Sequence, residues 1–315
     1  MRHLISLKEQ SREDLIAILD IARELKSRRR AGHLTNLLPA KTLVMLFQKT
    51  STRTRVSFEV AMTELGGHSV FLDSRSTQFL LTDYRDEIRA LMRFGHVLMM
   101  RALRSADVLT AASYNQIPVI DGCSEKYHPA QTLGDVLTMI EHSGGLDKIG
   151  KVAWLGPQNN VSNTLKLACA KLGLELVLGA PETDPASVDP ELDREAEKSE
   201  RIRITNDPDE AVRGADYVHT DTWMNMEFFE AGRVKPEFSD EYERRKAAFI
   251  PYQLNAALLA RNAPSARVMH CMPCHPGYEI ARDAIDHPNS VIFDQAENRL
   301  HIEKAILIWL LGVRI

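Results

Sequence analysis

The sequence predicts an α/β protein of two domains, each a mostly parallel sheet flanked by helices. Short apolar runs, typical of buried strands, alternate with amphipathic patterns of helical spacing along the chain. A Ser143-Gly144-Gly145 break separates two such alternating series. The length of 315 residues also exceeds one typical core, at roughly 150 residues per domain. We therefore expect one domain over residues 1–145, a second over 146–293 and a final helical segment over 294–315.

The first half opens with a predicted amphipathic helix. Ser11-Arg12-Glu13-Asp14 has the pattern of a capping box, apolar residues at helical spacing follow it, and Gly32 comes after them as a stop signal. Strand and helix patterns then alternate. We expect strands at residues 42–47, 68–72, 97–100 and 117–120, and helices at residues 54–65, 83–94, 106–113 and 131–142.

The second half continues the same alternation. Residues 181–199, rich in proline and acidic residues, are expected to form a surface loop and a helix. Because helices are expected between the strands, the second sheet should also be mostly parallel. The strands are expected at residues 152–155, 174–178, 217–220, 268–271 and 291–293.

Composition and charge exclude several classes of protein. A formal net charge of −4 gives no reason to expect a polyanionic partner, so we predict no nucleic-acid binding. No apolar stretch approaches the ~20 residues that span a bilayer, and the start of the chain leads into a charged helix rather than a signal peptide. We therefore expect no membrane partner and a cytoplasmic location. The 4 cysteines do not make a disulfide framework in a chain of this length, which fits a reducing compartment.

The segment Ser51-Thr52-Arg53-Thr54-Arg55 predicts an anion-binding site. It lies directly after the apolar run at 42–47 and directly before a helical pattern, so its hydroxyls and arginines stand at a helix N-terminus. The first N–H groups of a helix have no partners within the helix and carry about half a positive charge. A phosphate there would accept backbone, hydroxyl and guanidinium hydrogen bonds together. The alternative is an ordinary capped helix with solvated arginines.

Three further polar motifs stand at the ends of expected strands or starts of helices. Because parallel sheets bind ligands at the carboxyl edge, four such motifs divided between two domains predict a cleft in which a phosphate-bearing substrate meets a second molecule. The three motifs are His128-Pro129-Ala130-Gln131, Asp221-Thr222-Trp223 and His270-Cys271-Met272-Pro273.

Taken together, the motifs resemble those of the aspartate/ornithine carbamoyltransferase family, and most closely its ornithine-specific members. The resemblance runs over the full length and is carried by Phe-Gln-Lys-Thr-Ser-Thr-Arg-Thr-Arg at 47–55, His-Pro-x-Gln at 128–131, His-Cys-Met-Pro at 270–273 and Phe-Asp-Gln-Ala-Glu-Asn-Arg at 293–299. It implies a carbamoyl phosphate-binding first domain, an ornithine-binding second domain and a C-terminal helix that packs back on the first. It also implies a homotrimer or a higher multiple of trimers, with no cofactor and no metal.

The resemblance implies roles for residues of the carbamoyl phosphate site. Arg299 matches an arginine that returns from the C-terminal segment to complete the clamp on this substrate. Attack on the carbonyl group builds negative charge on its oxygen, which such donors would stabilise. The residues that match the phosphate-holding segment are Ser51, Thr52, Arg53 and Thr54. Those that match contacts to the carbonyl oxygen, bridging oxygen and carbamoyl nitrogen are Arg101, His128 and Gln131.

On the acceptor side the resemblance implies an amide for the α-carboxylate, a carboxylate for the α-ammonium group and a cysteine beside the reacting amine. Gln78 matches a residue that reaches into the site of a neighbouring subunit. The matched acceptor residues are Asn160, Asp221, Met226, Cys271 and Met272.

One departure from the family pattern bears on the acceptor. Ornithine enzymes usually read Asp-x-Trp-x-Ser-Met-Gly in this loop, whereas this chain has Asn225 in place of the serine and Glu227 in place of the glycine. Asn225 can still bond an amino acid, so L-ornithine, converted to L-citrulline, is the expected acceptor. Carbamoylation of putrescine, lysine or a shorter diamino acid is the alternative. A catalytically silent regulatory paralogue is a third reading, which the complete set of carbamoyl phosphate residues argues against.

Other readings of single motifs are weaker. His128 alone would more often be a structural histidine. Cys271-x-x-Cys274 invites a zinc site, but no second ligand pair has suitable spacing. Asp221 could simply cap the segment that follows it. A nucleotide-binding protein is excluded because the chain has neither Gly-x-Gly-x-x-Gly nor a Gly-Lys-Ser/Thr loop. Synthesis and breakdown of citrulline use the same site, so the sequence leaves the physiological direction open.

Overall fold

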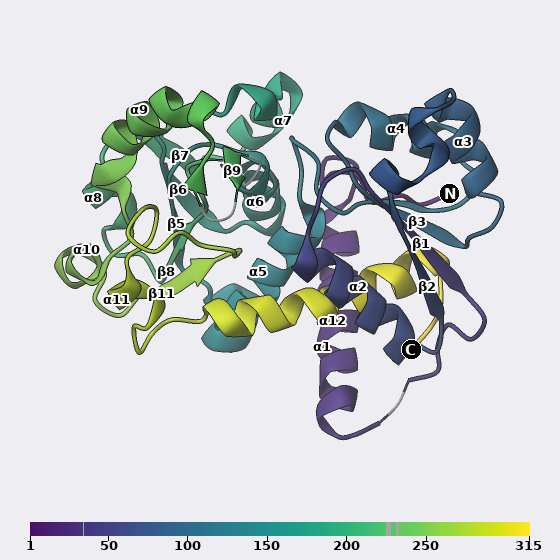
Figure 1. The fold of residues 1–315 in the computed structure, drawn as a ribbon. Helices are drawn as coiled ribbons and strands as arrows, with labels where there is room; N and C mark the ends of the chain where they lie inside the picture. The colour runs from purple at the N-terminus through teal and green to yellow at the C-terminus, as the bar shows by residue number, and fades with distance from the viewer. Residues whose placement is uncertain (34, 225–227, 231–232) are drawn as a thin grey trace. The chain divides into compact units, whose positions relative to one another are not determined.

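The computed structural model describes residues 1–33, 35–224, 228–230 and 233–315. The chain divides into two compact units, and each is described by itself. Unit 1 comprises Met1–Leu137, Asn163–Ala168 and Glu297–Ile315; unit 2 comprises Thr138–Ser162 and Cys169–Ala296. Each unit contains a parallel sheet flanked by helices, which confirms the predicted α/β class (Figure 1).

Unit 1 follows the predicted alternation closely. The capping box of the first helix is present, since Ser11 Oγ accepts from Asp14 N and the Asp14 carboxylate accepts from Ser11 N. The elements are α1 (Arg12–Arg30), β1 (Thr42–Phe47), α2 (Thr52–Glu64), β2 (His68–Asp73), α3 (Tyr84–Leu91), β3 (Val97–Arg101), α4 (Ser105–Ser113), β4 (Val119–Asp121) and the start of α5 (Pro129–Ser143).

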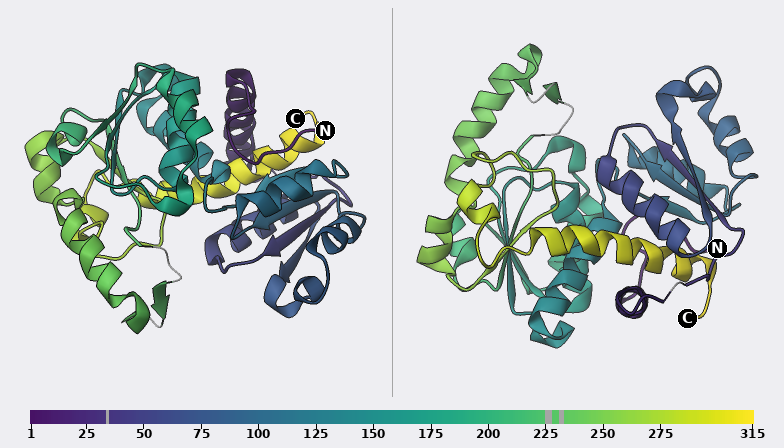
Figure 2. Two further views of the ribbon diagram at one scale, coloured as in Figure 1. Left: turned by 90° about the horizontal axis from the view of Figure 1, so that it is seen from above. Right: turned by 60° about the horizontal axis from the view of Figure 1, so that its bottom comes forward.

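The sheet of unit 1 has strand order β2-β1-β3-β4, all parallel. Side chains alternate across it, so Val44 and Leu46 of β1 pack with Leu98 and Met100 of β3 against α3 and α4. The last helix of the chain, α12 (Ile292–Leu311), contributes its residues from Glu297 onward to this unit. There it runs beside α2 (Figure 2). The predicted return of the C-terminal helix to the first domain is confirmed.

Unit 2 holds the second series of strands and helices. Its sheet has strand order β11-β8-β5-β6-β7, again all parallel. A buried cluster on one face joins β5, β6, β8 and β11 to the helices α8, α9 and α10. The elements are β5 (Lys151–Leu155), α6 (Asn160–Leu172), β6 (Glu175–Gly179), α7 (Pro190–Glu197), β7 (Ile202–Thr205), α8 (Pro208–Val212), β8 (Tyr217–Thr220), β9 (Phe229–Glu230), β10 (Arg233–Val234), α9 (Ser239–Phe249), α10 (Ala256–Asn262), β11 (Arg267–His270) and α11 (Arg282–Ile285).

One predicted strand is wrong. The run at 291–293 begins α12 rather than a strand, and Gln295 N donates to Val291 O at 2.9 Å as in a helix. Just before this helix, Ser290 forms an isolated bridge with Val268 of β11. Ile292 is buried while its neighbour Phe293 is 68% exposed, so the apolar run belongs to a helix face. A run of three apolar residues does not distinguish the two structures.

Among the described residues, three strands were not predicted: the edge strand β7, and the two short strands β9 and β10, which pair antiparallel with each other. The edge strand β7 has Arg203 within it, and none of its residues is fully buried. Such an edge strand carries little apolar signal. Among the residues that the structure describes, no helix combines the length and apolar character needed to span a membrane.

Candidate functional site

The segment that joins β1 to α2 in unit 1 gives α2 an N-terminus suited to binding an anion. Strand β1 stops at Phe47, and Ser51 is the N-cap of α2, its Oγ accepting from Thr54 N at 3.4 Å. The first turn of α2 contains no acidic residue. Its positive end is therefore not compensated by a local carboxylate, and Thr52 and Arg53 lie in this turn.

Arg299 of α12 lies within the same unit and joins two other predicted site residues. Its Nη2 donates to Thr54 Oγ1 at 3.2 Å and its Nη1 donates to Gln131 Oε1 at 2.7 Å. All three side chains are buried. Gln131 Nε2 in turn donates to Asp135 Oδ1 at 2.8 Å, so its amide is held in one orientation. The structure thus brings together residues from α2, α5 and α12 that are far apart in sequence.

His128 directly precedes α5 and is buried. Its backbone N donates to Thr164 Oγ1 at 2.9 Å, which fixes the start of the helix. Its ring Nδ1 is buried and, within the described part of the chain, has no hydrogen-bond partner. Buried polar atoms are nearly always bonded, so this nitrogen is suited to a ligand.

The electrostatics around His128 are strongly cationic. Burial lowers its pKa well below the ordinary value, and nearby positive charges lower it further. The imidazole is therefore neutral near pH 7, with one ring N–H and one ring acceptor. The contributing cations are Arg299, Arg101, Lys49 and Arg53.

Arg101 ends β3 at the carboxyl edge of the sheet, in register with Phe47 of β1. Its Nε is buried and has no hydrogen-bond partner among the described residues. Arg101 Nε and His128 Nδ1 are thus among the buried polar atoms of unit 1 that lack a hydrogen-bond partner within the described residues. Gln78 lies in a short 3₁₀ turn, Gln78–Leu80, and its predicted role at a neighbouring subunit stays a prediction.

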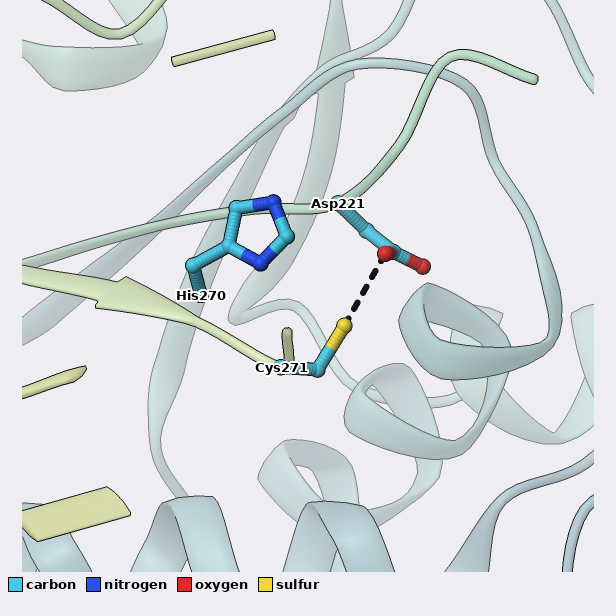
Figure 3. A group of neighbouring side chains, drawn as sticks. All are labelled: Asp221, His270 and Cys271. Carbon is cyan, nitrogen blue, oxygen red and sulfur yellow. Dashed lines mark hydrogen bonds between the residues drawn. The ribbon is translucent and has the colours of Figure 1, made fainter. Parts of the chain in front are cut away.

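In unit 2, Asp221 follows β8 and is the centre of a hydrogen-bonded group (Figure 3). Its Oδ1 accepts from Cys271 Sγ at 2.9 Å and from Thr222 N at 2.8 Å. Its Oδ2 accepts from Asn159 Nδ2 at 2.8 Å. Asp221 and Cys271 each follow a strand, and these two strands, β8 and β11, pair with each other.

Asn159 is a residue of this group that the sequence analysis missed. It is the N-cap of α6, and its Oδ1 accepts from Val161 N at 3.0 Å and Ser162 N at 3.1 Å. Those bonds turn its Nδ2 toward Asp221. The predicted residue Asn160 follows as the first residue of α6. A capping signature was the only sequence signal for Asn159, and it does not reveal the carboxylate partner.

His270 is the last residue of β11, and both of its ring nitrogens have hydrogen-bond partners. Its Nδ1 accepts from Met272 N at 2.8 Å, so its Nε2 is the protonated nitrogen that donates to Glu279 Oε1 at 3.2 Å. Met272 adopts a left-handed backbone conformation with φ 58°. The bond from Met272 N therefore helps to hold the loop that carries Cys271.

Ligand atoms of Asp221, His270 and Cys271 lie within 4.8 Å of one another, a spacing that a metal ion would accept. Figure 3 shows the thiol directed at the carboxylate and the imidazole bonded to neither. Since both imidazole nitrogens and the thiol already have hydrogen-bond partners, the donor set fits hydrogen bonding better than metal coordination. The predicted residues Asn225 and Met226, like Glu227, lie outside the described residues.

Both halves of the chain match domain models of one known protein family. Residues 2–141 match the aspartate/ornithine carbamoyltransferase, carbamoyl-P binding domain, and residues 149–310 match the Asp/Orn binding domain of the same family. The ornithine carbamoyltransferase of Methanospirillum hungatei is 42% identical over 312 residues, covering 99% of each protein. That of Archaeoglobus fulgidus is 41% identical over 315 residues, covering 99% of this chain and 98% of the relative.

Solved structures agree with these sequence relatives. The ornithine carbamoyltransferase of Pyrococcus furiosus superposes with a TM-score of 0.89 at 38% identity, covering 99% of this chain and 97% of that one. The anabolic enzyme of Campylobacter jejuni superposes with a TM-score of 0.87 at 34% identity, covering 99% of each. Since the family matches extend over nearly the whole sequence, the chain belongs to the aspartate/ornithine carbamoyltransferase family.

Proposed function

We propose that this chain transfers the carbamoyl group of carbamoyl phosphate to the side-chain amine of L-ornithine, giving L-citrulline and phosphate. The observation that carries the proposal is the neutral, buried His128 among four cations in the same unit as the uncompensated N-terminus of α2. A doubly negative acyl phosphate suits that site. The relatives reported above are ornithine carbamoyltransferases over their full length, which supports the acceptor.

The donor half of the reaction follows from the charges in unit 1. Ser51, Thr52 and Arg53 bind the phosphate group at the start of α2. The amine nitrogen of the acceptor attacks the carbonyl carbon, and negative charge moves to the carbonyl oxygen. Thr54, Arg101 and His128 stabilise that oxygen, each worth roughly 3 kcal/mol. The bond between carbon and bridging oxygen then breaks, phosphate leaves, and the nitrogen loses one proton. No covalent bond to the enzyme is formed.

On the donor side, His128 acts as a hydrogen-bonding group rather than as an acid. Its low pKa keeps it neutral, so it contributes one directed N–H without adding a further charge to the site. Gln131 contacts the carbamoyl nitrogen, and Arg299 completes the set of cations.

On the acceptor side, Asp221 binds the α-ammonium group, Asn160 the α-carboxylate, and Cys271 lies beside the reacting amine. Met272, Asn225 and Met226 complete the acceptor site. The attacking amine must be uncharged, and the acceptor must displace or share the present bonds of Asp221 to Asn159 and Cys271.

We propose domain boundaries of 1–145 for the carbamoyl phosphate-binding domain, 146–293 for the ornithine-binding domain and 294–315 for the returning helix. The assembly is proposed as a homotrimer, or a multiple of it, that acts in the cytoplasm. The Pyrococcus furiosus relative is described as anabolic, which favours citrulline synthesis within arginine metabolism.

A panel of amines tests the acceptor. The purified protein is incubated with carbamoyl phosphate and, separately, L-ornithine, putrescine, L-lysine and a shorter diamino acid, and each product is identified by mass. We expect turnover of L-ornithine to exceed that of every other amine by about tenfold or more, since only ornithine matches both the α-groups and the chain length. Robust use of another amine without ornithine turnover would reject the acceptor. Release of phosphate at the background rate with every amine would reject enzymatic function.

A further inference from the structure

We infer that Glu303 is a positioning residue for carbamoyl transfer: it holds the guanidinium of Arg299 so that its outer edge faces Thr54 and Gln131. The inference rests on the proposed function. It concerns a residue that takes no part in the sequence motifs and does not itself contact the proposed substrate.

The hydrogen bonds of Arg299 divide between two edges of the guanidinium. On one edge, Nε and Nη2 both donate to Glu303 Oε1, at 3.2 Å and 2.9 Å. On the other edge, Nη1 and Nη2 donate to Gln131 and Thr54. A guanidinium is planar, so fixing one edge fixes the direction of the other. Glu303 therefore determines where the remaining donor capacity of Arg299 points.

The pair is fully enclosed. The side chains of Arg299 and Glu303 are 5% and 0% exposed, and the two residues are one helical turn apart on α12. Removing one partner of a buried ion pair leaves an uncompensated charge and is strongly unfavourable, so Arg299 would seek another arrangement without Glu303. Because Arg299 and Glu303 are four residues apart on one helix, the position of the carboxylate relative to the guanidinium is fixed by the helix.

A second carboxylate in the same unit provides a natural control. Glu64, at the end of α2, pairs with Lys304 of α12 and with Arg29 of α1. Its bonds to charged side chains in the described part of the structure go to these two residues, and not to Arg299. Both acids join α12 to charged or polar partners inside unit 1. Only Glu303 acts on a residue of the proposed carbamoyl phosphate site.

Above about pH 7, where the Glu303 carboxyl group is ionised, its loss has two opposite effects on anion binding. It makes the site more positive, which would tighten binding, and it releases the guanidinium, which would weaken binding. We expect the second effect to be larger because two of the four hydrogen bonds of Arg299 end on Glu303. The direction of the change in affinity therefore decides between positioning and simple charge compensation.

The test compares Glu303→Leu, Glu303→Gln and the control Glu64→Gln in the full-length protein. Binding of carbamoyl phosphate is measured by calorimetry, and KM and kcat by citrulline formation. We expect Glu303→Leu to raise both the Kd and the KM for carbamoyl phosphate by about tenfold or more, with the KM for ornithine within about twofold. Glu303→Gln, whose amide oxygen still accepts from Arg299, should recover part of the affinity. Glu64→Gln should lower the unfolding temperature and leave both KM values within about twofold.

A double-mutant cycle with Arg299→Ala completes the test. If Glu303 acts through Arg299, then adding Glu303→Leu to Arg299→Ala changes carbamoyl phosphate binding by less than about twofold. Multiplied losses, or tighter binding in Glu303→Leu or Glu303→Gln, would overturn the inference. A wild-type protein that binds carbamoyl phosphate without forming citrulline would reject the proposed function, while the calorimetric comparison would still decide the role of Glu303.

Discussion

At the start of α2, two arginines two positions apart have different surroundings. Arg55 donates to Glu59 at 3.0 Å and its guanidinium lies 3.8 Å from the centre of the Phe71 ring. Arg53 is one of the cations that act on His128. We expect Arg53→Ala to lower kcat/KM for carbamoyl phosphate by about tenfold or more, because a charge-assisted hydrogen bond contributes at least ~1.5 kcal/mol. Arg55→Ala is the matched control, with an expected change below about threefold. Steady-state kinetics that show equal losses, or none for Arg53→Ala, would contradict this role.

His128 predicts a pH dependence of stability. Its pKa is lowered in the folded state by burial and then by the surrounding cations. The unfolded chain therefore takes up the proton first as the pH falls, so the stability present above about pH 6.5 is lost below it. Thermal unfolding of the wild type and of His128→Gln, from about pH 7.5 to about pH 5, checks this, and the wild type should lose more stability. Parallel curves would mean that His128 protonates equally in both states.

Glu303 predicts a dependence of the opposite sign. Burial raises its pKa to about 7, against the attraction of Arg299 and the nearby hydroxyl of Ser57. Because the folded state then holds this proton above the ordinary pKa of 4.5, the stability that the protonated form contributes is lost as the pH rises through about 7. Unfolding of Glu303→Gln should show a smaller loss between about pH 5 and pH 8 than the wild type. An unchanged slope would place the folded pKa of Glu303 near its ordinary value.

At the scale of elements, helix α6 has one residue that serves two purposes. Asn159 caps the helix and donates to Asp221. Asp is as good an N-cap as Asn, so Asn159→Asp should keep the helix while placing a second carboxylate beside Asp221. We expect the KM for ornithine to rise about tenfold or more and the KM for carbamoyl phosphate to stay within about twofold.

Asn255 supplies the control for that substitution. It caps α10, where its side chain accepts from Leu258 N at 2.8 Å, and its amide donates to Gln253 rather than to an acidic residue. Asn255→Asp should leave both KM values unchanged. A rise in the KM for ornithine in Asn255→Asp as large as that in Asn159→Asp would show that the effect comes from capping rather than from Asp221.

Local signals in the sequence predicted most elements, and tertiary contacts account for what was missed. Strand β1 coincides with its predicted range because an apolar run of strand length ends directly before the polar segment that starts the next helix. The role of Asn159 could not be predicted, since its partner Asp221 lies 62 positions away along the chain. The spacing of Arg299 and Glu303 is visible in the sequence, but the burial that gives the pair its importance is not. The site roles that the family resemblance implies stay predictions for kinetics to test.

At the scale of the whole molecule, the proposed trimer makes two measurements possible. Light scattering on the native protein should give three times the chain mass of 35.5 kDa, or a whole multiple of that. If Gln78 serves a neighbouring subunit, then inactive Gln78→Ala and Cys271→Ala chains, refolded together, should regain part of the activity, because some sites would receive both wild-type residues. A monomer, or mixed assemblies as inactive as their parents, would contradict the shared site.

The location of bound carbamoyl phosphate tests the central claim most directly. A crystal structure of the complex should show the phosphate group at the N-terminus of α2, on Ser51, Thr52 and Arg53, with Arg101 Nε and His128 Nδ1 newly hydrogen-bonded. Carbamoyl phosphate bound elsewhere in the molecule, with these two atoms still lacking partners, would contradict the account.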